Sequence, residues 1–193
     1  MIIQKVAPLQ EDIDKILSLK EAKSFMKIVS TDEDKDIQDH INAAIADAGG
    51  VTNRQFAKAT YELYLSNFPW ENYKLPKNPI NEIVSIEYMD LEGNYQTIDP
   101  STYYLFSRYE VGHIAFNVFP NFKINNHKKA VRITFISGYL KDFPMDLKQW
   151  LKVRVSTLNE IKEEITLGVS VSKNNHVDSI LKRYRIRSWE LEV

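Results

Sequence analysis

The chain contains no cysteine, so neither a disulfide framework nor a cysteine-based zinc site can form. It also has no apolar run that approaches the ~20 residues a membrane-spanning helix needs. Its start combines a short apolar run with Lys5, Pro8 and several acids, which differs from the pattern of a secretory signal peptide. We therefore expect a protein that is made and used in the cytosol and has no membrane partner.

An excess of one charge is also missing, since the formal net charge is −1 at pH 7. This near-balance excludes the global basic field that drives non-specific binding to nucleic acid. The charges are unevenly spread, however, because acidic side chains outnumber basic ones in residues 1–48 and basic ones outnumber acidic ones in residues 141–193. In an oligomer, an acidic face on one subunit could meet a basic tail on another subunit or on a partner protein.

Signatures of catalysis are absent. The four histidines have no neighbour at metal-ligand spacing, and there is no glycine-rich phosphate loop, nucleophile elbow or H-E-x-x-H helix. Asp32, Asp34 and Asp36 alternate as in a calcium loop, but Ile37 and Ala43 stand where such a loop requires Gly and Glu. We expect no metal, no cofactor and no catalytic residue.

What is present is an ordinary globular composition, 44% hydrophobic and 26% charged over 193 residues, which favours one domain with a core. Residues 18–50 predict two helices. Ser18 and Glu21 have capping-box spacing ahead of the first, and the acidic run from Thr31 precedes the second, which we expect Gly49-Gly50 to end. Residues 1–17 are expected to be an N-terminal arm, either extended or a short first helix.

Residues 51–140 predict an inserted antiparallel β region of about five or six strands. From Gln55 the pattern alternates between apolar and polar residues, as in a half-buried strand. Pro76 and Pro79 keep the next connection extended, because proline disfavours helix in the residue before it. Further strands are expected over residues 83–89, 95–98, 103–107, 113–118 and 130–136.

Residues 141–167 predict a long core helix that Pro144 opens. An apolar stripe runs along it, with Lys148 among the charged residues expected on the solvent side; the stripe is Leu147, Trp150, Leu151, Val155, Leu158, Ile161 and Ile165. Residues 168–193 are expected to be a mobile loop and a basic C-terminal segment that becomes ordered on a partner. The predicted fold class is therefore α+β, with N-terminal helices and a long C-terminal helix packed with the inserted β region in a single domain, residues 1–193.

Two groups of residues are candidates for a binding interface. Phe68, Trp70 and Tyr73 belong to the aromatic- and proline-rich connection between two predicted strands, and aromatic residues are enriched at interfaces. The second group is the basic segment formed by Lys182, Arg183, Tyr184, Arg185 and Arg187. Alternatively, the aromatic residues pack a two-sided sheet, and the four basic charges are too few to define a phosphate-binding patch.

Several segments follow one another in a characteristic order and spacing: Leu19–Ile28, Thr31–Ala48, Asn53–Phe56, Tyr61–Pro69, Leu75–Ile98, Tyr103, Val131–Tyr139, the Pro144 helix and Ile180–Arg185. In this order they resemble the phage head-tail connector family, the head-completion or adaptor proteins of long-tailed bacteriophages and their prophages. The N-terminal 17 residues and residues 168–177 have no counterpart in the resemblance.

The resemblance implies a structural virion protein and not an enzyme. Its members form a ring, expected here as a dodecamer on the virion with a free monomer as the alternative state in solution. The implied partners are the portal protein above the ring and a stopper or tail-completion protein below it. DNA passes through the ring without sequence-specific binding, and the implied location is the head-tail junction, with the host cytoplasm during assembly.

Two functions from other classes compete with this one. The aromatic residues of the β region would also suit a carbohydrate-binding or adhesive β module of a phage particle. A small hydrolase with a carboxylate site is the other alternative, but adjacent acids such as Glu163 and Glu164 are common on solvated surfaces.

Overall fold

The computed structural model describes residues 2–5, 9–69, 72–160 and 175–186. The chain forms two compact units. The helical unit comprises Leu9–Ala57 and Tyr139–Arg185, and the β unit comprises Met1–Pro8, Lys58–Gly138 and Ile186–Val193. Each unit has its own hydrophobic core.

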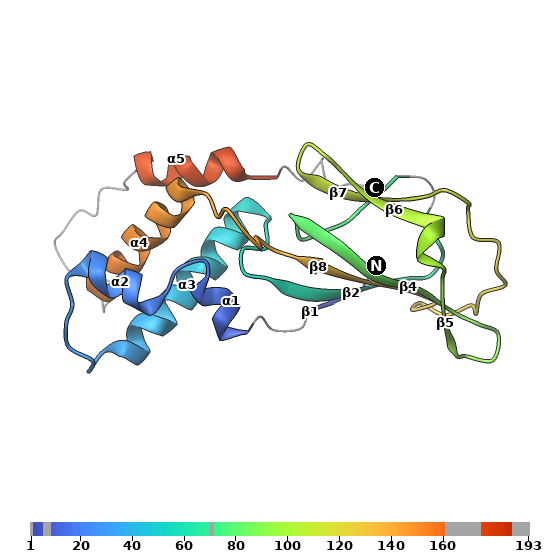
Figure 1. The fold of residues 1–193 in the computed structure, drawn as a ribbon, viewed down its shortest axis with the longest axis horizontal. Coiled ribbons are helices and arrows are strands. Elements are labelled where there is room, and N and C mark those ends of the chain that lie inside the picture. The colour runs from blue at the N-terminus through green and yellow to red at the C-terminus, as the bar shows by residue number, and fades with distance from the viewer. Residues whose placement is uncertain (1, 6–8, 70–71, 161–174, 187–193) are drawn as a thin grey trace. The chain divides into compact units, whose positions relative to one another are not determined.

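Among the described residues, the helical unit contains α1 (Gln10–Asp14), α2 (Leu19–Met26), α3 (Asp34–Thr52), α4 (Met145–Glu160) and α5 (Asn175–Tyr184) (Figure 1). The long helix α3 packs against α2, α4 and α5, and α4 also contacts α2 and α5. The helices predicted within residues 18–50 and after Pro144 are thus confirmed. The rest of the predicted core helix, residues 161–167, and residues 168–174 of the predicted loop lie outside the described residues.

Helix α2 begins where the capping box predicts. The Ser18 hydroxyl accepts a hydrogen bond from the Glu21 amide at 3.2 Å, and the Glu21 carboxylate accepts one from the Ser18 amide at 3.0 Å. The Lys148 side chain is less exposed than its position outside the apolar stripe predicts. Its side chain is only 18% exposed, and its ammonium lies 3.0 Å from the Glu21 carboxylate.

Helix α3 does not end at Gly49-Gly50, so that prediction is wrong. The helix continues to Thr52, whose buried hydroxyl donates a hydrogen bond to the Ala48 carbonyl at 2.6 Å. The left-handed residue that ends the helix is Asn53, with φ of 56°. Asparagine tolerates this conformation nearly as glycine does, which is why the two glycines are not needed as a stop.

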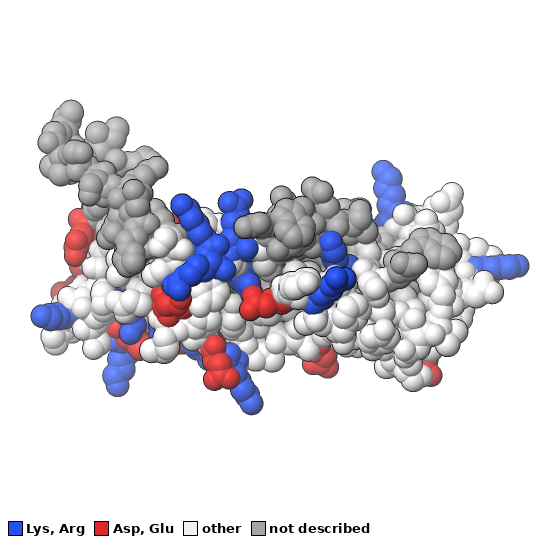
Figure 2. All heavy atoms as spheres, turned by 90° about the horizontal axis from the view of Figure 1, so that it is seen from above, with Lys and Arg blue, Asp and Glu red and all other residues white. Residues whose placement is uncertain are grey.

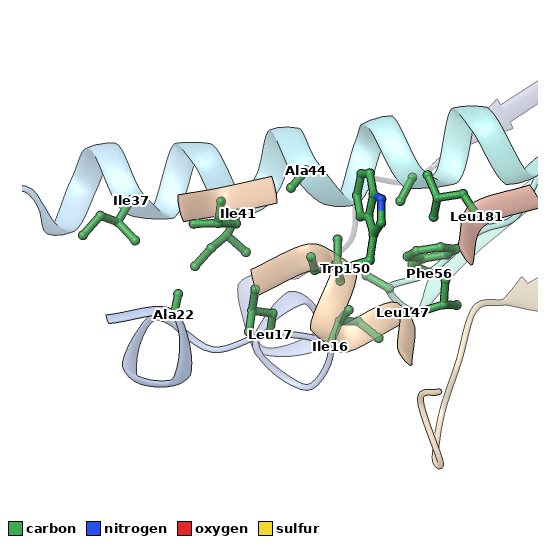
Figure 3. Close-up of a cluster of buried hydrophobic side chains, with 14 residues drawn as sticks. Ile16, Leu17, Ala22, Ile37, Ile41, Ala44, Phe56, Leu147, Trp150 and Leu181 are labelled. Atoms are coloured by element: carbon green, nitrogen blue, oxygen red, sulfur yellow. The ribbon is translucent and has the colours of Figure 1, made fainter. Parts of the chain in front are cut away.

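The core of the helical unit lies between α3 and α4 (Figure 3). Ile37, Ile41, Ala44 and Ala48 of α3 face this core, and its other buried members are Ile16, Leu17, Ala22, Phe56, Ala57, Leu147, Trp150, Leu151, Val155 and Leu181. The first four described members of the predicted α4 stripe are buried, and Leu158 is partly buried against the same cluster. The stripe prediction is therefore confirmed up to Glu160.

The β unit contains β1 (Ile2–Lys5), β2 (Ala59–Leu65), β3 (Tyr73–Lys74), β4 (Ile80–Met89), β5 (Tyr95–Thr97), β6 (Tyr103–Arg108), β7 (Val111–Phe116) and β8 (Val131–Ser137). A five-stranded sheet has the order β1-β2-β8-β4-β5, and a three-stranded sheet has the order β3-β7-β6. Every pairing is antiparallel. A short 3-10 helix, Pro100–Thr102, leads into β6.

Both sheets of the β unit contribute to one core. Tyr61 of β2 pairs with Phe135 of β8, and their rings stack with centroids 5.6 Å apart. Ile86 of β4 and Ile114 of β7 add side chains from the two different sheets to the same cluster. The period of two in the sequence therefore marks the correct buried face of β2.

Gly112 allows the two sheets to approach each other closely. A Cβ atom at this position would lie 2.6 Å from Cγ1 and 2.8 Å from Cβ of Ile80. The Gly112 amide also donates a hydrogen bond to the buried Asn78 side chain at 2.6 Å. No larger residue fits here without moving β4.

The predicted α+β fold, with an inserted antiparallel β region, is confirmed. The region differs from the prediction in detail. The predicted N-terminal arm contributes β1 to the sheet as well as forming α1, and the two-residue strand β3 has too short a pattern to be seen in the sequence. The strands also divide between two sheets, because β7 pairs with β3 and β6, and none of these three pairs with the five-stranded sheet.

Candidate assembly surfaces

The basic segment predicted as an interface forms α5. Leu181 is buried in the helical core, and Ile180 and Tyr184 pack against it. Lys182 and Arg185 point away from this core and are exposed. Figure 2 shows Lys and Arg side chains gathered over α5.

The carboxylate of Asp146, in the first turn of α4, holds the end of α5. It accepts a hydrogen bond from the Arg183 guanidinium at 2.9 Å and one from the Tyr184 hydroxyl at 2.8 Å. The same carboxylate accepts from the Leu147 amide at 2.9 Å, a position where a negative charge favours a helix N-terminus. Burial, together with the hydrogen bond to Asp146, raises the pKa of Tyr184 to about 12.

A second contact holds the C-terminal end of α5. The Arg54 side chain, which follows α3, is buried, and its Nε donates a hydrogen bond to the Tyr184 carbonyl at 2.5 Å. A cation at this end satisfies a carbonyl that the helix leaves unpaired. Two of the predicted basic-segment residues, Arg183 and Tyr184, therefore attach α5 to the subunit, whereas Lys182 and Arg185 are available to a partner.

The predicted aromatic anchors lie elsewhere. Phe68 is buried in the β unit, with ring centroids 6.2 Å from Tyr88 and 6.2 Å from Phe116. Tyr73 of β3 is also buried, and burial raises the pKa of its hydroxyl. Trp70 and Arg187 lie outside the described residues. In the free chain the two described aromatic residues pack the sheets, and their contact with a partner stays a prediction.

The outer face of the five-stranded sheet carries a charged pair that the sequence alone does not single out. The Arg132 guanidinium binds both oxygens of Glu87, at 2.7 and 2.8 Å, and lies 4.3 Å from the centre of the Tyr95 ring. The hydrogen bonds with Glu87 raise the pKa of Arg132. Alternation places both residues on the polar face, but only the pairing of β4 with β8 brings them together.

Two shallow hollows lie beside α2. One, of about 460 Å³, is lined by Leu19, Lys20, Lys23, Ser24, Ile28, Val29 and Asp34. The other, of about 420 Å³, is lined by Lys20, Glu21, Ser24, Phe25 and Lys152. Both are open to solvent and bring together no set of groups with obvious catalytic chemistry.

One of the isolated histidines is packed within the β unit. His113 is buried, its Nδ1 lies 2.9 Å from the Val111 carbonyl, and its ring stacks on Phe106. Within the described ranges, no group of three or more acidic or histidine side chains is arranged to hold a metal ion. None of the described helices is both long and apolar enough to cross a membrane.

Comparison with solved structures finds chains of the same fold. A chain from the neck of an empty gene transfer agent particle with C6 symmetry is 19% identical, with 97% of each chain covered and a TM-score of 0.77. A chain from the virion of a native gene transfer agent particle is 18% identical, with the same coverage of 97% and a TM-score of 0.76. A chain from the neck of the native particle with C12 symmetry is 18% identical, again with 97% of both chains covered, and has a TM-score of 0.74.

No curated protein matches the chain. A family model does, and its match extends from residue 15 to residue 187, which includes α2 to α5 and all strands except β1. The family is a structural one and not a family of enzymes, as the resemblance implies. This chain belongs to the head completion protein family.

Proposed function

We propose that this head completion protein is a subunit of the neck of a phage-like particle, where several copies form a ring at the junction of head and tail. The observation that carries the proposal is the fold, which matches chains from gene transfer agent necks over 97% of its length. The structures of those necks were computed with C6 and with C12 symmetry, which supports a ring of six or twelve copies here, and the resemblance implies the dodecamer.

The proposed partners are the portal protein on the head side and a stopper or tail-completion protein on the tail side. The ring would extend the DNA channel between them, without sequence-specific binding to DNA. We propose that residues 1–193 act as one head-tail connector domain whose helical and β units make different contacts. A closed ring requires such differing faces, because each subunit joins one face to another face of its neighbour.

Helix α5 is the surface we assign to the contact with the portal or a neighbouring copy. Lys182 and Arg185 are exposed and make no ion pair with the described residues. Basic side chains at the rim of an interface speed association and fix its register more than they add affinity. An acidic surface on the partner would complement them.

Deletion of the gene from the phage, prophage or gene transfer agent that encodes it tests the proposal. We expect DNA-filled heads and free tails that fail to join, visible by negative-stain electron microscopy, and restoration of joined particles when the protein is supplied from a plasmid. Deletion mutants that still produce tailed, infectious or gene-transferring particles would contradict the proposal. Cryo-electron microscopy of complemented particles should then place the added chain at the neck.

The carbohydrate-binding alternative has less support. Its motive is an aromatic surface, but Tyr61, Phe68 and Tyr73 are buried in the β unit. They form no exposed platform on which a sugar ring could stack.

A further inference from the structure

The loop between β7 and β8, residues 117–130, lies within the longest part of the chain that has no acidic residue. The chain contains 26 Asp and Glu residues, yet none lies between Glu110 and Asp142. Lysine and asparagine side chains take their place in the loop: Asn117, Asn121, Lys123, Asn125, Asn126, Lys128 and Lys129. The near-neutral charge of the whole chain conceals this local basic surface.

Hydrogen bonds to the strands fix the course of the loop. The Asn125 amide donates to the Met89 carbonyl at 2.9 Å, and the Met89 amide donates to the Ala130 carbonyl at 2.7 Å. The Ala130 amide in turn donates to the His127 carbonyl at 3.1 Å. Residues 125–130, which include Lys128, are thus attached at both ends to the end of β4, which orders this part of the loop before any partner binds.

The aromatic side chains of the loop face the β unit. The Phe122 ring stacks on Tyr88 with centroids 4.5 Å apart, and the Phe119 ring meets the edge of Phe116 at 6.1 Å. Both rings are partly exposed, at 48% and 40%, but each has an aromatic partner in the unit. Outward the loop presents exposed amines and amides together with Val118, which is 68% exposed.

The three lysines of the loop differ in their contacts with the described residues. Lys129 lies over the Tyr64 ring, with its Nζ 4.4 Å from the ring centre. Lys123 and Lys128 are exposed and have no hydrogen bond or ion pair with any described residue. A hairpin carboxylate near the loop, Asp90, is occupied by its own turn, accepting from the Asn94 amide and the Gln96 side chain, both at 2.8 Å.

We propose that the β7–β8 loop binds backbone phosphates of double-stranded DNA, chiefly through Lys123 and Lys128. This inference rests on the proposed function, which brings DNA to the neck. Lysine ammonium groups and asparagine amides are common phosphate partners, and interactions of this kind read no sequence. The absence of any acid over the whole segment favours a polyanion over a neutral protein surface as the partner of the loop.

Repetition around the ring turns a weak interaction into an effective one. Two lysines on a free subunit give little affinity for DNA at physiological salt, because each bound phosphate contributes a salt-dependent increment of modest size. Six or twelve copies around one duplex present the same pair repeatedly, and every binding event after the first is intramolecular. We therefore expect DNA binding in the assembled neck and little binding by the free chain.

Cross-linking in assembled particles tests this interaction, because the chain has no cysteine of its own. Asn126→Cys places a single thiol in the loop, and Ser24→Cys on α2 serves as the matched control. Each protein is labelled with a benzophenone maleimide, added to DNA-filled heads purified from the deletion mutant, and irradiated. We expect a nuclease-sensitive protein–DNA adduct from position 126 and none from position 24.

Removal of the charges shows whether the lysines bind the phosphates. Adding Lys123→Gln and Lys128→Gln to Asn126→Cys should abolish most of the adduct. The slope of the logarithm of adduct yield against the logarithm of salt concentration should become shallower by about 0.9 for each phosphate that the loop no longer neutralises. Lys20→Gln with Lys27→Gln is the control pair and should change neither. Incorporation into heads, measured separately by immunoblot, should be the same for all variants.

The remaining outcomes separate this inference from the proposed function. An adduct with another protein, a DNA adduct that ignores the lysine changes, or lysine variants that no longer enter heads would each overturn phosphate binding by the loop, the last because it indicates a protein partner for the loop. Failure of the unmodified chain to enter heads would instead contradict the proposed function.

Discussion

At the scale of single residues, Asp146 links two helices of the head completion protein. One carboxylate accepts from the first turn of α4 and from two side chains at the end of α5. Hydrogen bonds to an ionised group are roughly twice as strong as those between neutral groups. The position of α5 therefore depends on a residue that no sequence pattern distinguishes from other surface acids.

The raised pKa of Tyr184 predicts a loss of stability at alkaline pH. Burial, followed by the hydrogen bond to Asp146, raises this pKa to about 12, and burial does the same for Tyr61. An unfolded tyrosine titrates at about 10, so between pH 10 and 12 the folded chain holds protons that the unfolded chain has released. Stability is complete below that window, and we expect the free energy of unfolding to fall as pH rises through it.

Urea unfolding at a series of pH values measures this decline. Tyr184→Phe keeps the ring and removes the ionisable hydroxyl, so its stability should fall less steeply between pH 10 and 12 than that of the unchanged chain. Tyr104→Phe, at an exposed position, is the matched control and should follow the unchanged chain. Equal slopes for Tyr184→Phe and the unchanged chain would show that Tyr184 titrates normally.

Substitution of Leu151 tests how much packing in the helical core contributes to the free energy of unfolding. Its side chain is fully buried between α4 and its neighbours, so Leu151→Ala removes apolar packing and leaves a cavity. We expect a decrease of about 2–5 kcal/mol in the free energy of unfolding, measured by urea denaturation with circular dichroism. Lys152→Ala, the next residue on the same helix, should stay within about 0.5 kcal/mol, and a similar decrease in both would reject the assigned core face.

At the scale of elements, the fold could be predicted where one local signal decides. The capping box fixes the start of α2, and alternation fixes the inner face of β2 from Ala59 to Leu63. Prediction from local sequence signals fails where such a signal competes with packing between elements. Gly49 and Gly50 are strong stop signals, but packing of α3 on α4 and α5 carries the helix past them to Asn53.

The candidate site was less predictable than the fold, because its residues depend on pairing. Aromatic content marks Phe68 and Tyr73, yet their burial follows from a second sheet that includes a strand of only two residues. Lys182 and Arg185 of the predicted basic segment are exposed, whereas the Arg183 side chain binds a carboxylate on another helix. The sequence has no acidic residue between Glu110 and Asp142, but the net charge of the whole chain does not reveal this local excess of basic residues.

The two glycines of α3 give a prediction at the element scale. A Cβ atom at Gly50 would meet nothing within 4 Å, whereas one at Gly49 would lie 3.0 Å from the Arg54 carbonyl. Gly50→Ala should therefore raise the free energy of unfolding by about 1 kcal/mol, since alanine loses less backbone entropy in a helix. Gly49→Ala should gain less or destabilise, and thermal unfolding of the two variants side by side measures the difference.

If Gly50→Ala lowers the melting temperature, α3 does not continue through this position as a regular helix. Equal gains from both alanines would mean that the Arg54 carbonyl moves freely. That carbonyl belongs to the residue that holds the end of α5, so the comparison also reports how rigid this attachment is.

At the scale of the whole molecule, the contacts that hold α5 to its own subunit and the surface that we propose for assembly lie on different faces of this helix. Leu181, Arg183 and Tyr184 hold the helix to its own subunit, while Lys182 and Arg185 face outward. Truncation of the chain before α5 would remove both sets together, so a loss of assembly could not be told from a damaged helical core. Charge changes at the outward pair separate the two.

We expect Lys182→Glu with Arg185→Glu to fold normally and to bind DNA-filled heads less well. The reason is that neither side chain contributes to the core, whereas reversing two rim charges replaces attraction to an acidic partner with repulsion. Sedimentation of the variant with heads from the deletion mutant measures binding, and circular dichroism measures the fold. Lys20→Glu with Lys35→Glu, also exposed in the helical unit, is the control. The binding deficit should shrink in high salt, because screening weakens repulsion between exposed charges. Normal binding by the α5 variant would remove Lys182 and Arg185 from the assembly surface and leave the β unit and the other helices to supply it.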